Sequence, residues 1–150
     1  MQVIRTLALA DGVALTPELK AVLEDLHRDA DIAVTGIAAP YALEVGYVEG
    51  EVLLSLAGSE SHETFAVPLR ALRGVLRDYL RISESFHAAI SSGDLQRFEA
   101  IDLGKKALHD EAAEMLVDML APQLRLGHGT ARKLFTLICA LQPSGKTLLE

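Results

Sequence analysis

Few residues of this chain are spaced as a catalytic or metal site requires. Glu84 and His87 have the Glu-x-x-His spacing found in di-iron helical bundles. Such a site needs a second copy of the motif and two further carboxylates, and the sequence holds no second copy. Cys139 lies within an apolar run, which favours a small core residue over a nucleophile. We therefore predict no catalytic residue, no metal and no cofactor, and an enzyme is the less favoured interpretation.

Four arginines form what we call the arginine row: Arg70, Arg73, Arg77 and Arg81. Their spacing of three or four residues places them on one face of an expected helix. Such a row could bind phosphates, an acidic protein surface or the acidic half of a second copy of the chain. It could also be a solvated face, or one that pairs with the domain's own acids.

A second basic feature lies in residues 127–133, where Thr130 precedes Arg132 and Lys133. With a helix expected from residue 131, both cations fall in its first turn, near the positive end of the helix dipole. A carboxylate of the preceding helix or an external anion would resolve this conflict, and the internal acid is favoured. The internal candidates are Asp102, Asp110, Glu111, Glu114 and Asp118.

The elements that must position these residues are strands first and helices later. Residues 3–9, 32–37, 41–47, 52–56 and 64–67 are expected strands, and the last three alternate or run apolar with short links. Short links favour antiparallel pairing. Thr16 and Pro17 indicate the start of a helix that reaches about residue 30.

From Pro68 the apolar period becomes helical. One helix is expected to end near Gly93, the next to begin after Asp94 and to stop at Pro122. Residues 131–141 are apolar almost all round, so this last helix should be buried. We expect one α+β domain over residues 1–150, a small antiparallel meander packed against about four helices, with a frayed tail from about residue 143.

Composition excludes several classes of protein. The 150 residues suffice for one domain with a real core, and no apolar stretch approaches the roughly 20 residues of a membrane span. A single cysteine fits a reducing, cytoplasmic location. Residues 1–66 hold eleven acids and three bases, whereas residues 67–150 hold ten acids and eleven bases. Any nucleic-acid contact would therefore be local, through the second half.

Residues 130–139 read Thr-Ala-Arg-Lys-Leu-Phe-Thr-Leu-Ile-Cys, and residues 78–86, 99–111 and Pro40-Tyr41 hold further distinctive stretches. Together these stretches resemble Uncharacterised Protein Family 0262, a bacterial group, most strongly in residues 130–139. The similarity extends over roughly residues 39–142. The resemblance implies a bacterial cytosolic protein without assigned activity, and it directs attention to the polar residues inside the matching motifs. These residues are His109, Glu111, Thr130, Arg132 and Lys133.

The leading functional hypothesis is a non-catalytic binding or regulatory module that acts through a protein partner or through self-association. The candidate partner- or anion-binding residues are the arginine row with the five polar residues just named. One alternative is an RNA- or ribosome-contacting protein that uses the arginine row. Because single-stranded binding relies on stacked aromatics, and Tyr79 and Phe86 fall on the core stripe, this alternative is less favoured. The second alternative is an enzyme with a site around His109.

Overall fold

Alternating apolar residues in the middle of the chain form three consecutive antiparallel strands. In the computed structural model, which describes residues 2–141, these are β3 (Tyr41–Val48), β4 (Glu51–Ala57) and β5 (His62–Pro68). Glu49 and Gly50 join β3 to β4 with φ angles of 52° and 80°. Positive φ at both central residues is the conformation of a type I′ hairpin turn. The predicted meander is thus confirmed.

The first strand joins this sheet in parallel. β1 (Ile4–Leu9) lies next to β3 and pairs with it parallel, giving the strand order β1-β3-β4-β5. The expectation of antiparallel pairing is wrong for this strand. A parallel pair needs a long crossover, and α1 (Pro17–Arg28) supplies it between β1 and β3. The Thr16 hydroxyl accepts the Leu19 N–H at 3.1 Å and caps α1, as the sequence predicts.

A second, two-stranded sheet links distant parts of the chain. β2 (Ile32–Val34) pairs antiparallel with β6 (Leu124–Leu126). The sequence predicts a short strand near β2 but gives no sign of β6, whose three residues are too few to show a period. This pairing places the start of the last helix beside the residues that follow α1.

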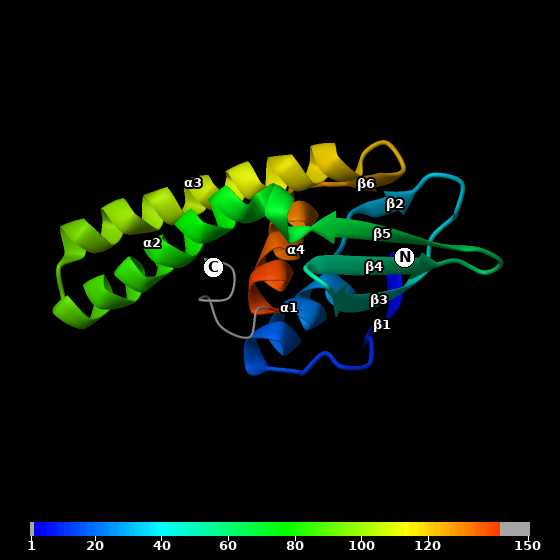
Figure 1. Cartoon of the computed structure of the whole chain (residues 1–150), viewed down its shortest axis with the longest axis horizontal. Coiled ribbons are helices and arrows are strands. Elements are labelled where there is room, and N and C mark those ends of the chain that lie inside the picture. The colour runs from blue at the N-terminus through cyan, green and yellow to red at the C-terminus, as the bar shows by residue number, and fades with distance from the viewer. Residues whose placement is uncertain (1, 142–150) are drawn as a thin grey trace.

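Two long helices form a hairpin that projects from the body of the molecule (Figure 1). A short 3-10 helix, η1 (Leu69–Leu72), leads into α2 (Arg73–Ser92), which packs against α3 (Leu95–Leu120). Gly93 ends α2 in the left-handed region at φ 74°, and the Asp94 side chain caps α3 by accepting the Arg97 N–H at 3.1 Å. In Figure 1 the joined ends of α2 and α3 lie far from the sheet.

The last helix lies at the centre of the core. α4 (His128–Ala140) packs against both α3 and α1, and six of its residues are buried, among them Phe135, Leu137 and Ile138. Buried residues of the sheet and of all four helices join in one cluster. The α+β class, the helices and the buried last helix are confirmed. The frayed tail expected from residue 143 lies outside the described residues. Within residues 2–141, none of the helices has the length and apolarity needed to cross a bilayer.

Candidate functional site

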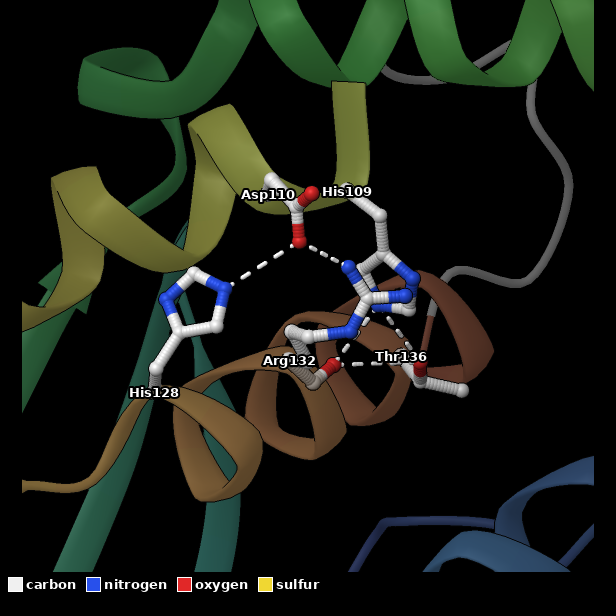
Figure 2. A network of polar contacts seen from close by, with 5 residues as sticks. All are labelled: His109, Asp110, His128, Arg132 and Thr136. Atoms are coloured by element: carbon white, nitrogen blue, oxygen red, sulfur yellow. Dashed lines mark hydrogen bonds and ion pairs between the residues drawn. The ribbon is translucent and has the colours of Figure 1, made fainter. Parts of the chain in front are cut away.

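A polar network joins α3 to α4 (Figure 2). His109 lies on α3, and its Nε2 donates to the backbone oxygen of Arg132 on α4 at 2.8 Å. The same Nε2 is 3.1 Å from Thr136 Oγ1, and the Thr136 hydroxyl donates to the Arg132 oxygen at 3.2 Å. Because a carbonyl oxygen can only accept, Nε2 carries the proton, and Nδ1 of the neutral ring keeps its lone pair.

The surroundings of His109 favour the neutral imidazole. Burial is the largest cause that lowers the pKa of His109, and the Arg132 charge adds to it, while the hydrogen bond to the Arg132 backbone opposes both. The ring lies 5.7 Å from that of Tyr79 and 5.5 Å from that of Phe135, measured between centroids. His109 is therefore a half-buried, uncharged group close to the Arg132 charge of α4.

Asp110 is the internal acid that pairs with Arg132. Its Oδ1 accepts from the Arg132 guanidinium and also lies 3.1 Å from His128 Nε2. The hydrogen bond from His128, followed by the bond and charge of Arg132, lowers the pKa of Asp110. The prediction that Arg132 has an internal acidic partner is confirmed, and Asp110 was one of the expected candidates.

Lys133 pairs with acids in the last turns of α1 and just after it, instead of with acids of α3. Its Nζ lies 3.4 Å from an Asp25 carboxylate oxygen and 3.8 Å from one of Asp29, and it donates to the Asp29 backbone oxygen at 2.7 Å. An internal partner is again confirmed, but its source was not predicted. The assignment of both cations to the first turn is wrong, because α4 begins at His128 and places them in its second turn. The conflict with the helix dipole is correspondingly weaker.

The two basic residues and His109 line one shallow pocket between α1, α3 and α4. The pocket has a volume of about 410 Å³, and Glu18 and Asp25 of α1 form its acidic side. Its lining residues are Glu18, Ala21, Val22, Asp25, His109, Gly129, Arg132, Lys133 and Thr136. A neutral imidazole, a hydroxyl and charges of both signs therefore face one space.

The other two residues of the matching motifs do not join this pocket. Thr130 is 6% exposed, and its hydroxyl accepts the Asp31 N–H at 2.7 Å, which fixes α4 to the residues before β2. Glu111 is exposed on α3 and is not among the lining residues. A binding role for either residue stays a prediction, and the contact of Thr130 gives it a structural role.

The arginine row divides between two environments, although all four side chains are exposed. Arg70, in η1, and Arg73, at the start of α2, line a cavity of about 540 Å³ with Tyr47, Glu49 and Glu51 of the β3–β4 hairpin. Arg77 and Arg81 lie further along α2, on the projecting hairpin. Arg77 Nε is 3.7 Å from the carboxylate of the adjacent Asp78, a weak surface pair.

The aromatic side chains nearest to the arginine row are engaged elsewhere. Tyr79 packs edge-on against Phe135 at a centroid distance of 5.1 Å, and Phe86 packs against Phe98 at 4.9 Å. Lys105 Nζ covers the Phe86 ring at 4.4 Å from its centroid. These rings point toward α3 and α4, as their spacing predicts. They do not form a stacking surface beside the arginines.

Cys139 is held as a thiol, and the histidines of residues 2–141 do not gather with other metal ligands. Burial raises the pKa of the Cys139 thiol to about 12, so the thiolate needed for nucleophilic attack is not populated near neutral pH. His87 is exposed on α2, as is Glu84. No three His, Cys, Asp or Glu side chains of the described chain come together as metal ligands.

Sequence reasoning missed three lining residues with polar side chains: Glu18, Asp25 and Thr136. Thr136 follows Arg132 by four residues, so it shares a helix face with it, and this spacing could have been used. Glu18 and Asp25 are seven residues apart and lie on one face of α1. Nothing in the sequence links α1 to α4, which are about 100 residues apart. The acidic side of the pocket was therefore not predictable.

Comparison with known proteins gives a consistent family match. The model of the uncharacterised protein family UPF0262 matches residues 7–144. A UPF0262 protein of Methylobacterium radiotolerans is 39% identical over 130 residues, covering 85% of this chain and 81% of that protein. One of Azorhizobium caulinodans is 38% identical over 139 residues, covering 89% and 86%. A relative from Phenylobacterium zucineum is 37% identical over 129 residues, covering 85% and 81%. No solved structure matches the chain significantly. With the family model matching most of its length, this chain belongs to the uncharacterised protein family UPF0262.

Proposed function

We propose that the chain is a cytoplasmic, non-catalytic binding module that acts through a protein partner, and that the projecting α2–α3 hairpin is its binding element. The observation that carries the proposal is the sparse burial of the outer hairpin, residues 77–111. Within these residues, all of them described, only Ala89 is buried. Five large hydrophobic side chains of the described chain are exposed, and three of them, Ile90, Leu95 and Leu103, lie on this hairpin.

Such a helical pair is poorly stabilised alone. Most helical stability in proteins comes from packing an apolar face against other elements. Here the base of the hairpin is anchored by buried Leu76, Ala112 and Leu116. Of the outer part, the end near the body contacts α4 through Tyr79, His109 and Asp110, and Phe86 and Phe98 pack the two helices against each other. Exposed apolar residues gathered on one projecting element are typical of an interaction site. Arg77 and Arg81 on the same element favour a partner with an acidic surface.

The proposal predicts that reversing the charge of Arg77 and Arg81 abolishes association. Tagged wild-type chain should capture a partner protein at low salt and less of it at high salt, because salt screens exposed charges. The Arg77→Glu/Arg81→Glu variant should lose this behaviour. Sedimentation velocity and affinity capture with tagged chain measure it.

The matched control is Lys20→Glu/Arg125→Glu, which makes the same charge change at exposed positions outside the hairpin. It should associate like the wild type. A wild-type chain that stays monomeric and captures no protein would refute the proposal. So would capture of a partner protein that the hairpin variant leaves intact. RNA retention on a filter at low salt, lost in the hairpin variant, would replace the protein partner with nucleic acid.

A second candidate function is an enzyme with its site around His109. The convergence of His109 and Arg132 on one pocket favours it, because catalytic sites combine a concave space with titratable groups of shifted pKa. Neutral His109 can accept a proton at Nδ1. Arg132 and Lys133, although paired internally, could stabilise negative charge that develops nearby.

Hydrolysis of p-nitrophenyl acetate or p-nitrophenyl phosphate tests this candidate. Activity should disappear in His109→Gln and persist in His87→Gln, a change at an exposed histidine of α2. Because burial lowers the pKa of His109 below 6.5, activity should continue somewhat below pH 6.5 and fall as the pH drops through the lowered pKa, where protonation removes the Nδ1 lone pair. The absence of turnover of both esters above buffer, or full activity in His109→Gln, would rule out His109 as the base.

A further inference from the structure

The face of α3 opposite the body of the protein carries an exposed leucine between two small residues. Leu103 is 71% exposed, and Ala100 and Ala107, one turn to either side, are also exposed. The opposite side of α3 carries half-buried Ile101, Lys105 and Leu108, and Gly104 at its edge lies close to α2, because a Cβ at this position would lie 2.8 Å from Ile82. Leu103 therefore points away from α2.

A negative and a positive side chain lie before and after Leu103 along α3, both on the same side of the helix. Glu99 precedes it by four residues and Lys106 follows it by three, so at about 100° per residue both lie roughly 40–60° to one side of the leucine. Glu99 is exposed, and the Lys106 side chain is 65% exposed. Lys106 Nζ is 3.1 Å from Asp102 of its own helix, which occupies one of its three donors.

This pattern is complementary to itself in one orientation only. Suppose that two copies of α3 pair antiparallel about a two-fold axis that passes between their Leu103 side chains. The side of one helix that carries Glu99 and Lys106 then lies beside the same side of the other helix. Residue 99 of each helix then lies opposite residue 106 or 107 of the other. Each Glu99 thus faces the Lys106 of the second copy, and the two leucines meet between the alanines. A parallel pair would instead bring opposite flanks together, so Glu99 and Lys106 of each copy would lie on opposite sides of the contact and would not meet.

We propose that the partner of the hairpin is a second copy of this chain, held by antiparallel pairing of the two α3 helices around Leu103 with reciprocal Glu99–Lys106 ion pairs. The inference rests on the proposed function and makes it specific. The contact is isologous, as in most homodimers, so each copy supplies both charges. Ala100 and Ala107 allow the helices to approach to the short end of the usual 8–10 Å range.

Charge exchange gives a test with an internal control. Glu99→Lys and Lys106→Glu should each weaken dimerisation about tenfold or more, because each places like charges together twice. The double variant Glu99→Lys/Lys106→Glu should dimerise like the wild type. An equimolar mixture of the two single variants should form a heterodimer, since both ion pairs are restored across that interface. Sedimentation equilibrium measures the dissociation constants.

The apolar part is tested by Leu103→Ser, which should also abolish the dimer. Leu15→Ser, at a position that is 59% exposed before α1 and outside the hairpin, should leave it unchanged. Unfolding curves of each variant verify that the monomer is folded.

The outcomes separate this inference from the more general function. A dimer whose dissociation constant is unchanged by the substitutions at positions 99, 103 and 106 would overturn the α3 pairing. The chain would then be a module that self-associates through another surface. A monomer that still captures a different protein through Arg77 and Arg81 would overturn the pairing and retain the binding function. A monomer that captures nothing would overturn both.

Discussion

Replacing Leu137 by alanine should lower the free energy of unfolding by about 2–5 kcal/mol. Leu137 has no exposed surface, and its neighbours on α4, Leu134 and Ile138, are buried as well. The helix lies between α1 and α3, so the missing side chain leaves a cavity that the surrounding elements cannot easily close. Urea unfolding monitored by circular dichroism measures the loss.

Leu95→Ala is the matched control for this prediction. Leu95 is 67% exposed on α3, so the same truncation there should change the stability by less than about 1 kcal/mol. A loss at Leu137 as small as that at Leu95 would place α4 at the surface and contradict the described core.

The second large effect is expected at Tyr41, where removing one oxygen should cost about 1–3 kcal/mol. Tyr41 is 2% exposed, and its hydroxyl accepts the Val34 N–H at 3.0 Å and donates to the Ile37 oxygen at 2.6 Å. Phenylalanine fills the same space except for this oxygen. It would leave two backbone groups of the segment around β2 without their partner.

Thermal or urea unfolding of Tyr41→Phe measures the cost. Tyr47→Phe is the control, because Tyr47 lies on the same strand, is half-buried and lines the cavity at the β3–β4 turn. Its hydroxyl bonds to none of the described residues, so its removal should be nearly neutral. Equal stability of Tyr41→Phe and the wild type would show that the hydroxyl is not what fixes β2 to β3.

Much of the fold could be predicted from the sequence because it depends on local patterns of residues. The Thr16 cap, the Glu49-Gly50 turn and the Gly93-Asp94 junction each depend on residues within a few positions of one another, and each is found as predicted. The apolar periods likewise fix where the helices and the meander strands form. The burial of α4 follows from an apolar surface that extends around the helix.

Pairings between distant segments could not be predicted from local patterns. The parallel contact of β1 with β3 depends on where α1 packs, and the β2–β6 sheet joins segments about 90 residues apart. β6 itself is a strand only because β2 lies beside it. These contacts are chosen by the packing of whole elements, which no short window of sequence contains.

The same distinction between local patterns and contacts of distant elements applies to the candidate site. The sequence and its family resemblance singled out His109, Arg132 and Lys133, and the sequence predicted an anionic partner for the two cations, either an internal acid or an external anion. Only the tertiary structure decided which acids those are, Asp110 for Arg132 and Asp25 for Lys133, and that His109 shares their pocket. The physical reason is that a charge or an imidazole needs partners within a few ångströms. Within α4, helical spacing brings Thr136 close to Arg132. The partners from α1 and α3 come close only because the three helices pack around the pocket.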